Sequence, residues 1–132
     1  MSTGMEGFAA GASALMGQAQ GLRAAVDNGQ LVMNPEAAEA VAKVYDEKAD
    51  DVRKARAGSE RLILNGAFGD CFIGRDMEKK FRDKVNAPET GLVAILTNVE
   101  EILKNMAQAY RDSARDMRNV DEDHARTIQR TI

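Results

Sequence analysis

The sequence has little of several residue types that particular folds and functions require. It contains one Cys, one His, two Pro and no Trp, and aromatic residues make up only 5% of its 132 residues. A single Cys excludes a framework of intrachain disulfides. Strand-like alternation of apolar and polar residues is absent, whereas 44% of the residues are hydrophobic, many of them Ala, and 30% are charged. These features predict an all-α fold whose long helices meet along Ala, Leu, Val and Met.

Charge and hydropathy exclude two classes of partner. The net charge is −3, and basic and acidic residues are interleaved along the chain without a basic, aromatic-containing patch, so we expect no nucleic-acid binding. No apolar run approaches the ~20 residues that a membrane-spanning helix needs, so we expect no membrane insertion. The first residues lack a basic region and contain Glu6 among broken apolar stretches, which argues against a cleaved signal peptide.

Residue sets typical of catalysis or metal binding are missing. His124, the only histidine, has Asp121 three positions before it but no further ligand at helical spacing. Cys71 has no histidine nearby in sequence to activate it as a nucleophile. Its thiol is therefore expected to be packed in the fold, to have no role, or to form a disulfide with a second chain. The glycines around Cys71 are not followed by the Lys-Ser/Thr step of a nucleotide-binding loop. We therefore expect a protein that binds other proteins, without enzymatic activity, cofactor or metal.

Residues 1–30 form a Gly/Ala-rich segment with a weak helical pattern. Apolar residues recur at steps of three and four over residues 5–27, which is typical of an amphipathic helix. They are Phe8, Ala12, Leu15, Ala19, Leu22 and Val26. Four glycines interrupt this pattern, and each costs about 1 kcal/mol relative to Ala in a helix interior. The segment is therefore predicted to be helical only when it is docked on the rest of the chain.

Residues 31–132 are predicted to form a helical-hairpin domain. Asn28-Gly29 marks a turn, Asn34 is the expected N-cap and Pro35 the first residue of a helix that continues to about residue 64. Its near-heptad stripe consists of Val41, Tyr45, Ala49 (or Lys48), Val52, Ala55, Ser59 and Leu62. A short helix is expected near residues 75–85, followed at Pro88 by a break or a kink.

The last predicted helix spans about residues 92–130 and carries a heptad stripe over about four heptads, which favours coiled-coil-like pairing. Together, these predicted helices indicate a long antiparallel hairpin with a short N-terminal helix. The residues expected to form the seam with a partner are Leu96, Val99, Leu103, Met106 and Tyr110. Ile95 and Ile102 beside this seam indicate a second contact surface. Either the smaller helices of the chain cover it, or a homodimer or another partner does.

Two stretches give the chain a resemblance to a known family. The helix start LVMNPEAAEAV and the turn FGDCFIGRDMEKKF resemble the WXG superfamily of ESAT-like helical hairpins, in particular its longer, divergent actinobacterial members, over about residues 31–128. The aromatic-x-Gly step of that family falls on Phe72-Ile73-Gly74, with Phe68-Gly69 as the competing placement. The resemblance implies that an aromatic side chain plugs the end of the hairpin while the glycine permits the turn.

The export signal of this family, Tyr-x-x-x-Asp/Glu, is not matched. Tyr110 is followed four positions later by Ala114, and Met117-x-x-x-Asp121 has the acid and the spacing without the aromatic residue. The resemblance thus implies a substrate or pairing partner in type VII (ESX) secretion whose partner carries the signal. It would be cytoplasmic before export and then secreted without a cleaved signal peptide. The alternative is a cytoplasmic adaptor or chaperone that binds a larger secreted protein or toxin through residues 1–30.

Overall fold

A computed structural model describes residues 3–61, 69, 71–88 and 91–131. These residues form four helices: α1 (Thr3–Asp27), α2 (Pro35–Arg61), α3 (Phe72–Asn86) and α4 (Leu92–Thr131). No strand occurs in these ranges, which confirms the all-α prediction. The chain between α2 and α3, where the glycine turn was predicted, lies mostly outside the described residues.

The start of α2 follows the local signals in the sequence. Gly29 adopts a left-handed conformation with φ of 68°, which glycine tolerates without strain. The Asn34 side-chain oxygen accepts hydrogen bonds from the backbone N–H groups of Glu36 at 2.8 Å and Ala37 at 3.4 Å. Asn34 is therefore the predicted N-cap, and Pro35 occupies the first helical position, where no N–H is needed.

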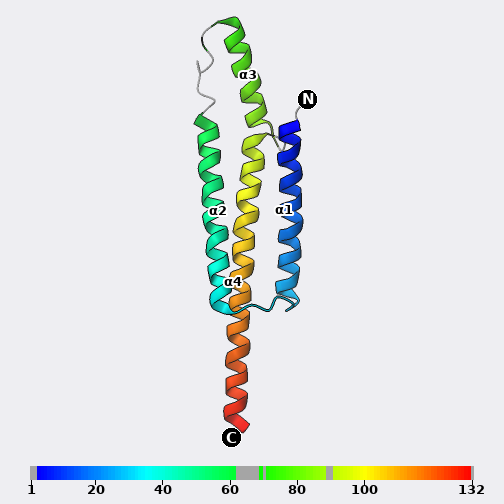
Figure 1. The fold of residues 1–132 in the computed structure, drawn as a ribbon, viewed down its shortest axis with the longest axis vertical. Coiled ribbons are helices and arrows are strands. Elements are labelled where there is room, and N and C mark those ends of the chain that lie inside the picture. Colours follow the sequence, from blue (N-terminus) through cyan, green and yellow to red (C-terminus); the bar gives the residue numbers. More distant parts are fainter. Residues whose placement is uncertain (1–2, 62–68, 70, 89–90, 132) are drawn as a thin grey trace.

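The helix α4 lies between α1 and α2 and contacts both (Figure 1). In Figure 1, α2 runs antiparallel to α4, whereas α1 runs in the same direction as α4. α1 and α2 make at most marginal contact with each other. The three helices therefore form an open layer with α4 in the middle, and not a closed bundle.

Both ends of this layer carry a helical projection. α3 extends beyond the end of α2 and contacts the layer through α4 (Figure 1). At the opposite end, α4 continues past α1 and α2, and residues 118–129 are exposed. The region around Pro88 is a true break between helices, because α3 ends at Asn86 and α4 begins at Leu92. Gly91 closes this joint by donating its backbone N–H to the Ala87 carbonyl at 2.8 Å.

The core is built mainly from small side chains. Five alanines have no exposed surface: Ala38, Ala42, Ala107, Ala109 and Ala114. The larger buried residues of α4 include Ile95, Ile102 and Met106. Alanine at the contacts lets helix axes approach closely, at the short end of the usual 8–10 Å range. Because alanine contributes little apolar area, the core depends on close packing along the whole length of α4.

Candidate interaction surface

The predicted turn motif is only partly described by the structure. Phe68 lies outside the described residues, and Gly69 has φ of 89°, a left-handed value that favours glycine. Phe72 is the first residue of α3 and is 82% exposed. The expectation that the Phe72 ring plugs the end of the hairpin is therefore wrong. α3 begins beyond the end of α2 (Figure 1), and the helix that it contacts is α4. Gly74 is buried in the first turn of α3.

Cys71 has a local structural role that the sequence did not reveal. It is the N-cap of α3, and its Sγ accepts a hydrogen bond from the Gly74 backbone N–H at 3.3 Å. The usual N-caps are Ser, Thr, Asp and Asn, so the sequence pattern did not mark this position. The residue is exposed and its thiol is free, so it is not the packed thiol that was one of the alternatives.

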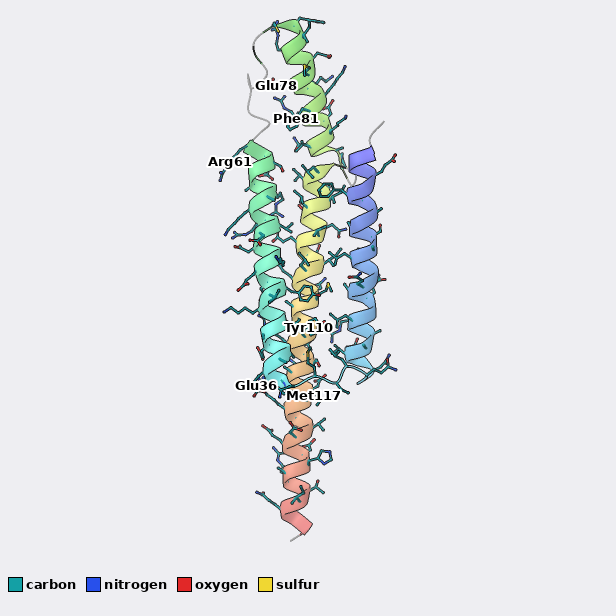
Figure 2. All side chains as sticks on the ribbon, in the orientation of Figure 1. Glu36, Arg61, Glu78, Phe81, Tyr110 and Met117 are labelled. Carbon is teal, nitrogen blue, oxygen red and sulfur yellow. The ribbon has the colours of Figure 1, made fainter. Side chains whose placement is uncertain are left out.

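The predicted seam lies along α4 and is largely covered by the chain itself. Leu96, Leu103 and Met106 are buried, whereas Val99 and Tyr110 are half-buried. On the flank toward α2, the ring of Tyr110 stacks on Tyr45 with centroids 5.7 Å apart. Figure 2 marks Tyr110 on the part of α4 that lies between α1 and α2.

The flank of α4 toward α1 carries the apolar residues beside the seam. Ile95 and Ile102 are both buried. Ile102 lines a hollow together with Met16 and Arg23 of α1. This second surface was expected to be covered either by the smaller helices of the chain or by a partner. The structure shows the first, because α1 of the same chain lies against it.

Between these two flanks, an apolar strip of α4 stays partly uncovered. Val99 lines a shallow hollow of about 460 Å³ together with Phe8, Leu15 and two glycines of α1, and Phe8 is 53% exposed. By helical register, the side of α2 that carries Tyr45 faces the same opening. We call this side of the layer the open face. It comprises Phe8, Leu15 and Leu22 of α1, Val41, Val44, Tyr45 and Val52 of α2, and Val99 and Tyr110 of α4.

Ion pairs join α4 to its two neighbours outside the open face, and we call them the paired contacts. Asp112 follows Tyr110 by two positions, or about 200° around the helix, so it points away from the open face. Arg111 and Arg118 lie about 80–100° around α4 from Tyr110, on the flank toward α2. The four pairs are Arg23–Asp112 at 2.8 Å, Arg56–Glu100 at 2.6 Å, Arg111–Asp46 at 2.5 Å and Arg118–Glu39 at 3.1 Å.

These contacts shift the pKa values of two carboxyl groups. A hydrogen bond from Lys104, with further attraction by Arg56, lowers the pKa of Glu100. Burial opposes ionisation of Asp112, but hydrogen bonds from Arg23 and Gln108 outweigh it and lower the pKa of that residue. Both groups are therefore ionised and paired in the folded protein at neutral pH.

Acid is expected to destabilise the protein through these carboxylates. A folded-state pKa below the unfolded value of about 4 stabilises the fold above that value, and this contribution is lost as the pH falls through the folded pKa. We expect the Glu100→Gln variant to melt below the wild type at pH 7 and the difference to shrink as the pH falls below about 4. Circular dichroism melts at several pH values measure this. Glu101→Gln, at an exposed neighbour, is the control, and a difference that does not change with pH would contradict the assignment.

The residues considered for export lie at the end of the layer. Met117 is half-buried where α4 leaves α1 and α2, and it is marked there in Figure 2. Asp121 and His124 are exposed on the projecting part of α4. In the described ranges, no three His, Cys, Asp or Glu side chains gather in a way that would hold a metal ion.

Two further findings concern membrane-spanning helices and similarity to known proteins. No described helix has an apolar stretch that would let it cross a bilayer. Comparison with protein-family models, curated proteins and solved structures finds no match to this chain.

Proposed function

We propose that this chain is a non-enzymatic, WXG-like helical protein that acts through helix–helix association as a substrate or pairing partner in type VII (ESX) secretion. The single observation that carries the proposal is the open face. It presents half-buried Val99 and Tyr110 between two helices that make at most marginal contact with each other. An apolar strip that the chain leaves uncovered is typical of a site for another helix.

The arrangement of α2 and α4 also supports the resemblance. They are long, antiparallel and packed through Ala42 and Ala107, which have no exposed surface. In this proposal, the two helices belong to the hairpin whose glycine turn the sequence predicts at Gly69 or Gly74. The third helix, α1, extends the binding surface beyond what a two-helix hairpin offers.

The proposal assigns the export signal to the partner. Met117-x-x-x-Asp121 lacks the aromatic residue of the family signal, although Asp121 is exposed on a projecting helix. The chain is then cytoplasmic before export and reaches the medium as part of a pair.

A second candidate function, an adaptor or chaperone for a larger secreted protein, is favoured by α1. Gly7, Gly11 and Phe8 line the hollow beside Val99, and an added Cβ at either glycine would have no neighbour within 4 Å. The surface of α1 therefore has room for a closely approaching segment. In this function the chain remains in the cell while its cargo leaves.

Export is the test that separates these functions. We expect a tagged copy, expressed from its native locus so that its partner is present, to accumulate in the culture medium. Deleting the type VII secretion ATPase should abolish this accumulation, with a cytoplasmic enzyme measured as the control for lysis. Retention in the cells of both strains would contradict the secretion proposal and favour the adaptor.

A further inference from the structure

We propose that α1 is a displaceable cover: it opens from α4 as a unit while α2 and α4 stay packed, and the flank of α4 that it leaves accepts a helix of a partner protein. The partner helix carries Leu-sized side chains where α1 has glycine, and a basic residue opposite Asp112. This rests on the proposed function, which requires a helical partner. It goes further by naming where that partner binds, the chemistry of its helix and the element that controls access to the site.

The contact between α1 and α4 is narrow. In residues 6–27, Ala12 and Val26 are the buried residues. A hollow of about 460 Å³ lies beside Val99 on the side of the open face, and a hollow of about 340 Å³ lies beside Ile102. By helical register, the two hollows flank the contact on opposite sides. α1 therefore rests on α4 along a thin line, with unfilled space on either side of it.

The contact between α2 and α4 is much firmer. Ala38 and Ala42 of α2 have no exposed surface. Three of the four paired contacts join α2 to α4, whereas Arg23–Asp112 is the one that holds α1. The four glycines of residues 6–27 also weaken α1, each by about 1 kcal/mol relative to Ala. Local opening begins in the segment with the fewest buried contacts, so α1 opens before α2 does.

Opening of α1 uncovers an apolar flank of α4. Ile95, Ile102 and Ala109 follow one another at steps of seven, so they lie on one side of the helix. The two isoleucines are 4% exposed, Ala109 has no exposed surface, and α1 is the helix beside Ile102. This flank is ~21 Å long and adjoins Val99 on the open face. An apolar groove of this kind is a typical site for an amphipathic helix.

The hollow beside Val99 indicates the chemistry of the partner helix. Gly7 and Gly11 line this hollow, and an added Cβ at either glycine meets nothing within 4 Å. A helix with Leu-sized side chains at these two positions, one turn apart, fills that space and gains apolar contact that α1 lacks. The side chain of Asp112 is 15% exposed and pairs with Arg23, so the partner helix needs a basic residue about three turns later.

The same hollow argues against α1 of a second copy as the occupant. An α1 helix exchanged between two chains would rebuild the same contact, with glycine at the same positions and Arg23 on Asp112. Such an exchange gains no contact within the site and loses the freedom of two separate chains. A helix that carries larger side chains at the glycine positions gains the missing contacts and can compete with α1.

Hydrogen exchange of the full chain, followed by mass spectrometry, tests the opening of α1. We expect α1 to be open in about 0.1–10% of molecules, which slows its amide exchange about 10- to 1,000-fold. The amides of α2 and of residues 95–114 should be protected about tenfold or more beyond this. Equal protection of α1 and α4 would overturn the displaceable cover.

A pair of glycine variants tests the cause of the opening. Gly11→Leu should slow the exchange of α1 by about tenfold, because it fills the hollow beside Val99 and removes a helix-weakening glycine. The matched control is Gly58→Leu in α2, where an added Cβ also meets nothing within 4 Å, and it should leave the exchange of α1 unchanged. Equal effects of the two variants on α1 would overturn the hollow as the reason for its weak attachment.

A peptide serves as the probe for the partner helix. It consists of residues 3–27 with Gly7→Leu and Gly11→Leu, and it is added to the full, isotopically labelled chain. With about 1–10% of the chain open, an intrinsic Kd of about 1 µM appears as about 10–100 µM. Binding should speed the exchange of the chain's own α1 by about tenfold or more, while α2 stays protected. The same peptide with Arg23→Glu should bind about tenfold more weakly, because it places a carboxylate against Asp112.

Three results of the peptide experiment would overturn the proposal in distinguishable ways. No binding above this range of concentration would overturn the site for a partner helix. Binding without faster exchange of α1 would overturn the displacement and place the peptide on the open face. Crosslinks from α1 of one copy to α4 of another would overturn the partner protein in favour of a second copy. The export measurement tests the proposed function separately, so each result leaves that function standing if the chain still reaches the medium.

Discussion

Replacing Leu103 with Asp is expected to lower the free energy of unfolding by about 3–5 kcal/mol, the largest effect of a single substitution predicted for this chain. Leu103 is buried, and it lies one heptad before Tyr110 on the side of α4 that faces the other two helices of the layer. The substitution removes apolar area at the centre of the layer and places a carboxylate there with no counter-charge built for it. A domain of this size is typically stable by only about 5–15 kcal/mol, so much of the folded population is lost near body temperature.

Urea unfolding followed by circular dichroism measures this loss. The control is Leu103→Met, which keeps the volume and apolar character and should cost less than about 1.5 kcal/mol. A Leu103→Asp variant as stable as the control would mean that this side chain is not buried in solution.

Replacing Gly91 with Ala is expected to destabilise the joint between α3 and α4 by about 1–3 kcal/mol. An added Cβ at Gly91 would lie 2.5 Å from both the N and the O of Ala87, and these backbone atoms cannot move aside as a flexible side chain can. Either the hydrogen bond from Gly91 to Ala87 breaks, or α3 changes its direction relative to α4. Thermal unfolding gives the loss of stability.

The matched control is Gly17→Ala in α1, where an added Cβ meets nothing within 4 Å. Alanine is the better helix former by about 1 kcal/mol, so this variant should melt about 3–5 °C above the wild type. If Gly91→Ala lowers the stability and Gly17→Ala raises it, then Gly91 is required because the backbone approaches closely there, whereas Gly17 only weakens its helix. A destabilised Gly17→Ala variant would mean that this side of α1 contacts another group in solution.

Much of the fold was predictable because it depends on local signals. Asn34 and Pro35 set the start of α2 through an N-cap and a fixed backbone angle, and the heptad stripe predicted α4. Residues 1–30 were predicted to form a short helix only when docked on the rest of the chain, and α1 is docked on α4 but is longer than expected, at 25 residues. Tertiary packing of Ala12 and Val26 against α4 outweighs the cost of its glycines.

The candidate surface was less predictable, because periodicity reveals that a helix has an apolar side but not what covers it. The seam through Leu103 and Met106 was expected to face a partner, and α1 and α2 bury it. Arg23 and Asp112, which are 89 positions apart, form an ion pair that no spacing rule indicates. The exposure of Phe72 follows from where α3 begins relative to α2, and the turn motif does not encode that position.

The paired contacts and the apolar contacts of the layer give the molecule an opposed response to salt. Added salt screens Arg111–Asp46 and Arg118–Glu39, which are both about half exposed, and so weakens their contribution to the attachment of α2 to α4. Sulfate and similar salts strengthen the burial of apolar surface, which also holds these helices together. The two kinds of contact between α2 and α4 are therefore coupled to salt with opposite signs.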